Sequence, residues 1–115
     1  MGIQPSPEEL DRMFHAFADA SRRGMVDRLS RGPASVTELA QPLGMALPSV
    51  MKHLAVLEAG GVVRSQKLGR VRTYHLAPDA LETLETWVAE RKLNLNRQFD
   101  RLEQYLAEQD AGGRA

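Results

Sequence analysis

The sequence predicts a mainly α-helical chain that contains one small β-hairpin. Apolar residues recur at helical spacing over most of the 115 residues, and clusters of Gly, Pro and Ser divide them into short segments. Between residues 62 and 76 the pattern changes to β-branched and basic residues around Gly69-Arg70, which is typical of a hairpin. The predicted order is therefore four helices, two strands and a last helix.

Two short helices are predicted in the first part of the chain. Residues 1–7 contain two prolines and are expected to form a loose arm, in which Ser6 can cap the first helix. Residues 19–21 end that helix and cap the second one. Arg22 and Arg23 then lie at the positive end of the second helix dipole, which is unfavourable. Each of these arginines is expected to have a partner, either a nearby carboxylate or a DNA phosphate.

Residues 35–59 are predicted to form two further helices joined by a glycine turn. Ser35 and Glu38 form a capping box at the start of the first of these helices, and Gly44 ends it. The second helix occupies residues 48–59. Two helices of this size joined by a turn are typical of the helix-turn-helix unit that reads DNA, and a basic hairpin directly after it is typical of a wing.

Positive charge gathers around this predicted unit. Residues 45–75 hold five basic groups and one acidic group, a net charge of +4, although the whole chain has a net charge of zero. A face of one sign can attract phosphates without making the rest of the protein bind nucleic acid. The alternative is that these charges only solvate the hairpin. We predict that double-stranded DNA contacts Ser49, Lys52, His53, Lys67, Arg70 and Arg72.

The last helix is predicted over residues 78–109, and Asn94 and Asn96 leave open whether it is continuous or broken. Its apolar stripe is longer than one small core can cover, which favours a partner chain over a helix folded back on its own domain. We expect one domain over residues 8–110 and a disordered tail over 111–115. An intertwined homodimer is predicted through the first and last helices, with the interface residues Leu10, Phe14, Phe17, Leu84, Trp87, Val88, Leu95, Phe99, Leu102 and Leu106.

Four sequence motifs indicate a protein family when they occur together in one chain, although each motif alone is weak evidence. They are residues 17–23, residues 35–40, the stretch from Lys-His-Leu to Gly-Gly-Val-Val at 52–63, and the Gly-Arg hairpin at 69–76. Together they resemble the ArsR/SmtB family of bacterial winged helix-turn-helix repressors. The resemblance implies a homodimer that represses its own operon by binding a palindromic operator. Family members often have Ser where Ala46 and Met51 stand, so capping and phosphate contact at these two positions are not expected.

The chain departs from the metal-sensing members of that family. Their sites use a Cys-x-Cys type motif on the third helix, or Asp and His ligands on the last helix. The chain has no cysteine, and residues 77–115 contain no histidine. His15, His53 and His75 lie on separate predicted elements and do not form a ligand cluster. The resemblance therefore implies a non-metal-sensing branch, with no metal site and no cofactor.

Other classes of function find little support in the sequence. A Gly-rich phosphate loop, a His-Glu-x-x-His pattern and a nucleophile–base pair are all absent, so we do not expect an enzyme. The lack of a long apolar run and of signal-peptide features favours the cytoplasm. The remaining alternative is a winged-helix module that docks proteins without affinity for DNA. The sequence leaves open a small-molecule or protein effector.

Overall fold

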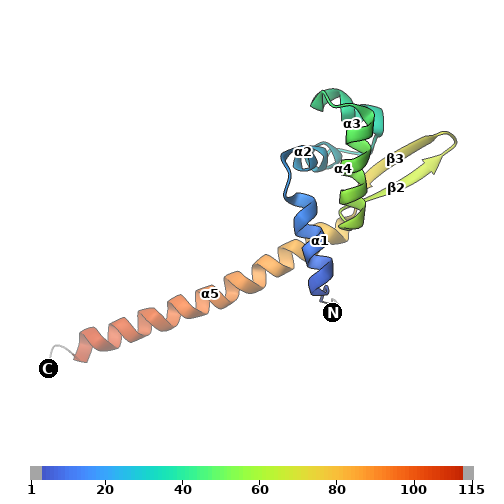
Figure 1. Ribbon diagram of the computed structural model, residues 1–115. Helices are drawn as coiled ribbons and strands as arrows, with labels where there is room; N and C mark the ends of the chain where they lie inside the picture. Colours follow the sequence, from blue (N-terminus) through green and yellow to red (C-terminus); the bar gives the residue numbers. More distant parts are fainter. Residues whose placement is uncertain (1–3, 113–115) are drawn as a thin grey trace. The chain divides into compact units, whose positions relative to one another are not determined.

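The computed structural model describes residues 4–112, which form five helices and three strands (Figure 1). The helices are α1 (Pro7–Phe17), α2 (Ala20–Leu29), α3 (Val36–Leu43), α4 (Leu47–Ala59) and α5 (Pro78–Gly112). The strands are β1 (Ala34–Ser35), β2 (Val63–Leu68) and β3 (Val71–Leu76). One compact unit ends at Leu81 and a second begins at Glu82, so α5 contributes to both. The mainly helical class with a small hairpin is confirmed.

Strand β1 is the element that the sequence prediction missed. The three strands form one antiparallel sheet in the order β1-β3-β2, in which Ala34 pairs with Tyr74 and Ser35 with Thr73. Two residues are too few to produce a recognisable alternation of apolar and polar side chains. The predicted order of elements is otherwise correct.

Side-chain caps set the starts of the first three helices, as predicted. Ser6, Asp19 and Ser35 each accept a hydrogen bond from the backbone N–H three residues later, at 3.1, 3.0 and 3.3 Å. Glu38 completes the capping box by accepting from the backbone N–H of Ser35 at 3.1 Å. Pro7, the last residue of the expected arm, is the first residue of α1, as expected for a proline directly after the capping Ser6.

Helix α5 continues without interruption through Asn94 and Asn96. Asparagine in a helix costs at most about 0.7 kcal/mol relative to alanine, which does not break a long helix. The helix also continues beyond its predicted end at residue 109. Ala111 and Gly112, which were expected in a disordered tail, are helical. Residues 113–115 and the first three residues of the predicted arm lie outside the described residues. None of the described helices has an apolar stretch long enough to cross a membrane.

The core of the first unit joins α2, α3 and α4 to the base of the hairpin. Its largest fully buried side chains are Met25, Leu39, Leu54, Leu57, Val50, Val62 and Val63. Helix α1 approaches the end of α4 at Gly60, where an added Cβ atom would lie 2.8 Å from the carbonyl oxygen of Arg12 and 2.9 Å from the Cβ of Ala16. A glycine is therefore needed for α1 to pack against α4.

We predict that Gly60→Ala lowers the free energy of unfolding by about 1–3 kcal/mol, because the new methyl group overlaps the backbone of α1. Chemical denaturation followed by circular dichroism measures this change. Gly112→Ala is the control, since nothing lies within 4 Å of a Cβ at that position. Equal stability of the Gly60 variant and the wild type would show that α1 does not pack as described.

Candidate nucleic-acid interface

Helices α3 and α4 form the helix-turn-helix unit of the described chain. Gly44 ends α3 in the left-handed conformation with φ of 61°, which lets the chain turn directly into α4. Helix α4 buries Val50, Leu54 and Leu57 completely and leaves Ser49 and Lys52 exposed. The predicted polar face of α4 is therefore accessible at these two positions.

The start of α4 has no side-chain cap. Ala46 occupies the capping position without a side-chain hydrogen bond, as the sequence predicts, and Pro48 lies in the first turn. Met51, where phosphate contact is not expected, has an exposed fraction of 56%. It therefore does not fill the core of the first unit.

A tight turn directs the tip of the wing. Leu68 pairs with Val71, so Gly69 and Arg70 are the two central residues of the turn. Gly69 has φ of 63°, whereas every non-glycine residue in the described part of the chain has negative φ. A positive φ at the first central position alone matches a type II′ turn, which suits the twist of a hairpin. Lys67, Arg70 and Arg72 are all exposed.

Two of these basic residues oppose each other across the hairpin. Lys67 and Arg72 are direct cross-strand partners, and like charges in this position destabilise a sheet. Arg72 donates a hydrogen bond to the hydroxyl of Ser65 at 2.8 Å, which neutralises no charge. Arg64, in contrast, forms an ion pair with Asp79 at 2.8 Å. The basic pair near the tip of the wing is thus the part of the hairpin that an external anion would stabilise.

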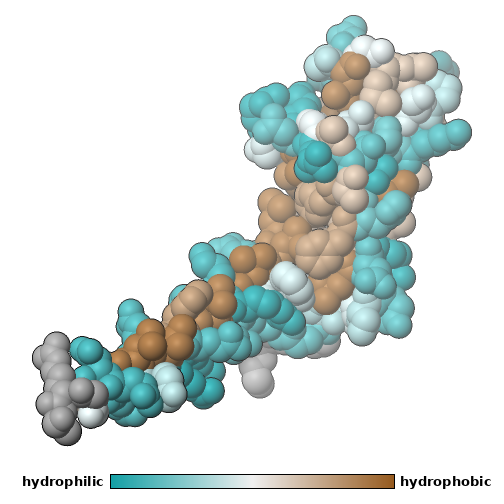
Figure 2. Space-filling model, turned by 60° about the vertical axis from the view of Figure 1, so that its left-hand side comes forward, coloured by the Kyte–Doolittle hydropathy of each residue, from teal (hydrophilic) through white to brown (hydrophobic). Residues whose placement is uncertain are grey.

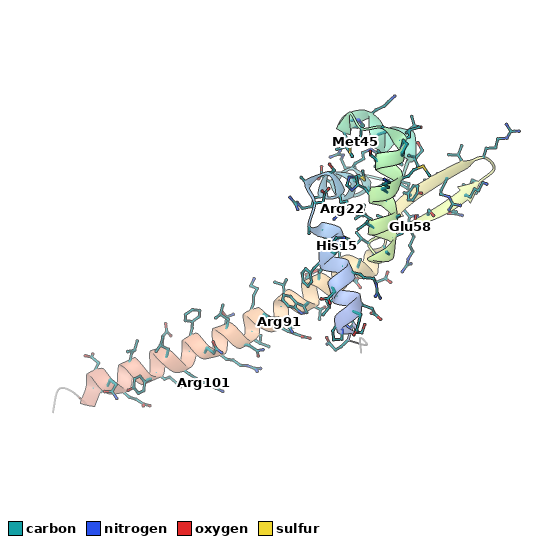
Figure 3. The ribbon with its side chains drawn as sticks, viewed as in Figure 1. His15, Arg22, Met45, Glu58, Arg91 and Arg101 are labelled. Atoms are coloured by element: carbon teal, nitrogen blue, oxygen red, sulfur yellow. The ribbon has the colours of Figure 1, made fainter. Side chains whose placement is uncertain are left out.

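Arg22 has partners that the sequence analysis did not foresee. Its side chain is buried, and it donates from Nε to the carbonyl of Ala16 and from Nη2 to that of His15, both at 2.9 Å. Nη1 lies 3.3 Å from Nδ1 of His53 on α4. Figure 3 places Arg22 beside the end of α1 that carries His15. The direct hydrogen bonds of this side chain therefore go to carbonyls in the last turn of the preceding helix, while its charge also acts on the carboxylate of Asp19.

His53 is less exposed than the predicted outward position implies. Its side chain is 21% exposed, and Nδ1 lies 3.9 Å from a carboxylate oxygen of Asp19 as well as close to Arg22. When Nδ1 accepts a hydrogen bond from Arg22, the neutral ring carries its proton on Nε2, which can donate to another group. Contact between His53 and DNA stays a prediction.

The three histidines stay apart in the structure as they do in the sequence. Within residues 4–112, no three His, Cys, Asp or Glu side chains gather closely enough to hold a metal ion. The assignment to a non-metal-sensing branch stays a prediction, because it depends on which effectors the protein responds to.

Comparisons with known proteins identify the family. Residues 17–66 match a family described as a helix-turn-helix domain. The HTH-type transcriptional regulator Rv2034 of Mycobacterium tuberculosis is 42% identical over 76 residues, which cover 66% of this chain and 71% of that protein. The crystal structure of the ArsR family transcriptional regulator RHA00566 is 46% identical with a TM-score of 0.75, and the match covers 82% of this chain and 97% of that one. The chain belongs to the ArsR family of transcriptional regulators.

Family membership settles several of the predictions. The winged helix-turn-helix fold, a role in transcription regulation and the absence of an enzymatic function are confirmed by these relatives. A further relative is the homodimeric winged helix-turn-helix DNA-binding domain of Mb0332 from Mycobacterium bovis. Its solution structure is 28% identical with a TM-score of 0.63, and the match covers 75% of this chain and 82% of that one. One relative of this ArsR-family chain is therefore a homodimer.

The Asp19 cap makes part of the stability depend on pH. The backbone N–H of Arg22, together with the charges of His53 and Arg22, lowers the pKa of the Asp19 carboxyl below its ordinary value of 3.8. A lowered pKa in the folded state gives stability that is complete above the unfolded-state pKa and is lost as pH falls through the folded-state pKa.

We predict that Asp19→Asn weakens the loss of stability between about pH 5 and pH 3, because asparagine caps a helix as well as aspartate but does not titrate. Urea unfolding of both proteins at several pH values measures the difference. The Asp19→Asn variant keeps part of the slope, since hydrogen bonds also lower the pKa values of Glu38 and Asp79. Parallel curves for the two proteins would contradict the assigned role of Asp19.

Proposed function

We propose that this ArsR-family regulator represses its own operon as a homodimer that binds a palindromic operator. Helix α4 would lie in the major groove, and the wing would contact the phosphate backbone. The observation that carries this proposal is the facing pair Lys67 and Arg72, which costs the free hairpin stability and fits a phosphate between or beside the two side chains.

Base recognition is assigned to the exposed face of α4. Ser49 and Lys52 are exposed, whereas Val50, Leu54 and Leu57 of the same helix are fully buried, so the two polar side chains remain available to base edges. Lysine donates to the acceptors of guanine, and serine can donate or accept. His53 is assigned to the same surface through Nε2, with its ring held in place by Arg22.

Backbone contact is assigned to Lys67, Arg70 and Arg72 of the wing. Phosphate contacts position a protein on the duplex without reading sequence, and they make binding strongly dependent on salt. Arg64 is left out of this set because Asp79 already neutralises it. The +4 charge of residues 45–75 therefore overstates the charge available to DNA.

The dimer interface is assigned to α1 and α5. Four apolar side chains of α5 are each about half exposed, namely Leu95, Phe99, Leu102 and Leu106. Their spacing of three and four residues places them on one face of the helix, where apolar surface follows α5 (Figure 2). Val88 continues this face at 46% exposed, and Phe14 of α1 is 43% exposed.

The remaining predicted interface residues are partly covered in the single chain. Leu10, Phe17, Leu84 and Trp87 are half-buried, and the guanidinium of Arg91 covers the ring of Trp87 at 4.3 Å. The homodimeric state of Mb0332 supports the same assembly here. A two-fold dimer of this kind would set its α4 helices about 34 Å apart, which is one turn of DNA.

The protein-docking alternative loses its support because the relatives are transcriptional regulators. A repressor meets its operator inside the bacterial cell, so the proposal includes a cytoplasmic location. It also includes an effector, either a small molecule or a protein, that changes operator affinity.

We predict that the double variant Lys67→Gln and Arg72→Gln binds DNA less tightly but is more stable. Removing two phosphate contacts should reduce the slope of log affinity against log salt by about 1.8. Removing the like-charge pair should raise the free energy of unfolding by about 0.2–1 kcal/mol. The experiment selects the operator from a random DNA pool with the wild type, then measures affinity at several salt concentrations and thermal stability.

Two comparison variants sharpen this test. Arg97→Gln with Arg101→Gln removes the same charge from exposed positions of α5 and should leave the salt slope unchanged. Ser49→Ala should alter the preference for particular bases by about 1–3 kcal/mol while leaving the salt slope intact. An unchanged slope in the wing variant would exclude the wing from the interface, and failure to enrich any DNA would refute the proposed function.

We predict that Leu102→Glu converts the homodimer into a monomer and reduces operator affinity at least about tenfold, because a charge enters the apolar face of α5. Sedimentation measures the assembly. Leu93→Glu is the matched control, since Leu93 is 53% exposed and lies on the opposite side of the same helix. A dimeric Leu102 variant, or an equal effect at Leu93, would be inconsistent with this interface.

A further inference from the structure

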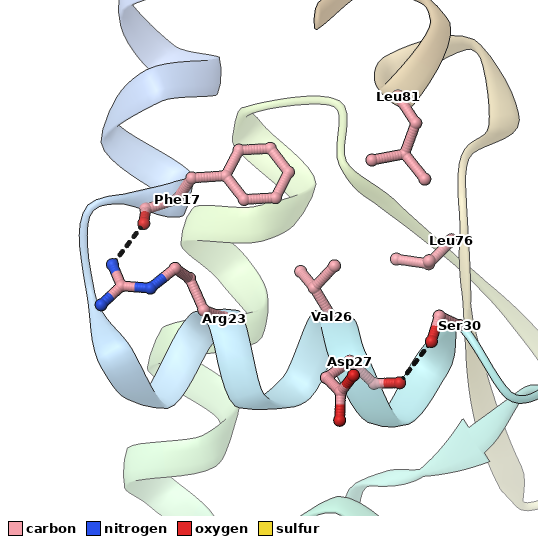
Figure 4. A pocket seen from close by; sticks show the side chains of 7 residues that line it. All are labelled: Phe17, Arg23, Val26, Asp27, Ser30, Leu76 and Leu81. Atoms are coloured by element: carbon pink, nitrogen blue, oxygen red, sulfur yellow. Dashed lines mark hydrogen bonds between the residues drawn. The ribbon is translucent and has the colours of Figure 1, made fainter. Parts of the chain in front are cut away.

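An open pocket of about 330 Å³ lies within the first unit, between α2, the end of α1, the end of β3 and the first turn of α5 (Figure 4). Its lining residues are Phe17, Arg23, Val26, Asp27, Ser30, Leu76 and Leu81. This volume is at the lower end of the range for small-molecule sites, which indicates a compact ligand.

The walls of the pocket are apolar, and one end carries a positive charge. The apolar part is formed by Phe17, Val26, Leu76 and Leu81. Of the two charged lining residues, Asp27 forms an ion pair with Arg31 at 3.2 Å. Arg23 has no carboxylate partner in the described part of the chain, and it donates only from Nη1, to the carbonyl of Phe17 at 2.8 Å. Because a guanidinium has five N–H donors, Arg23 keeps donors for an anion.

The charge of Arg23 is connected to the DNA-reading helix through its neighbour. Arg22 and Arg23 both donate to carbonyls at the end of α1, Arg22 to His15 and Ala16 and Arg23 to Phe17. Arg22 also reaches His53 on α4. An anion bound to the remaining donors of Arg23 would draw the guanidinium toward itself and so weaken its bond to the carbonyl of Phe17, which holds the end of α1.

We propose that this pocket binds a small amphipathic anion, with its apolar body against Val26 and Leu76 and its acidic group on Arg23. Occupancy changes operator affinity because the end of α1 is bonded through Arg22 to His53 of α4. The effect on DNA rests on the proposed function, whereas binding of the anion does not.

Two fluorescent probes with the same aromatic skeleton test the binding. One is anilinonaphthalene sulfonate, and the other is phenylnaphthylamine, which lacks the acidic group. We expect the purified wild type to bind the sulfonate at least about tenfold more tightly than the neutral probe, because the charge-assisted bond to Arg23 is present only for the sulfonate. Equal affinity for the two probes would overturn the proposal.

Three variants locate the binding. Arg23→Gln should remove the preference for the sulfonate and leave the affinity for the neutral probe unchanged, and Val26→Trp should weaken both probes by filling the pocket. Arg97→Gln, at an exposed position of α5, should change neither. Circular dichroism checks that each variant is folded. If the sulfonate still binds to both pocket variants, the probe binds elsewhere on the protein. If sulfonate fluorescence disappears as the dimer forms, a second copy of the chain occupies the pocket instead. Either result would refute the proposed site.

Operator binding is then measured with saturating sulfonate. The wild type should change its operator affinity at least about threefold, and Arg23→Gln should show no change. Sulfonate binding that depends on Arg23 without any change in operator affinity would refute the coupling alone. If the protein binds no DNA, the proposed function fails, while the probe measurements still decide the nature of the pocket.

Discussion

The hydrogen-bonded, buried guanidinium of Arg22 is the interaction on which the arrangement of α1, α2 and α4 depends. Burying a charge is unfavourable unless hydrogen bonds compensate it. Here two backbone carbonyls of α1 and the ring of His53 supply that compensation. Within residues 4–112, every buried side-chain nitrogen or oxygen has a hydrogen-bond partner. One side chain of α2 therefore links the end of α1 to the middle of α4, the helix proposed to read DNA.

Electrostatics divides this neutral protein into parts with different roles. Arg64 is neutralised by Asp79, and Arg22 is used inside the fold, so neither basic residue is available to a phosphate. Lys67 and Arg72 instead face each other, and neither forms an ion pair with an acidic residue among residues 4–112, at some cost to the hairpin. Such a cost is common at binding sites, where a local arrangement that is unfavourable in the free protein becomes favourable in the complex.

The sequence predicted those features that depend on local chemistry. Caps at Ser6, Asp19 and Ser35 and the turn at Gly44 involve groups a few residues apart, so the helix boundaries followed from the sequence. The partners of Arg22 did not, because they include a ring 31 residues further along the chain and depend on how α1, α2 and α4 pack. The same packing leaves the side chain of His53 only 21% exposed, less than its predicted outward position implies. Strand β1 was missed because its pairing with β3 carries no periodic signal.

Ser35 belongs to two structures at once. It pairs with Thr73 as part of β1, and its side chain caps α3. The base of the wing and the helix-turn-helix unit are thereby joined at a single residue. In the proposed complex, both elements that meet the duplex are then held in one orientation before it arrives. Association then requires little internal rearrangement, so its speed is governed by diffusion and charge attraction, and the fixed angle between groove and backbone contacts restricts which DNA shapes fit.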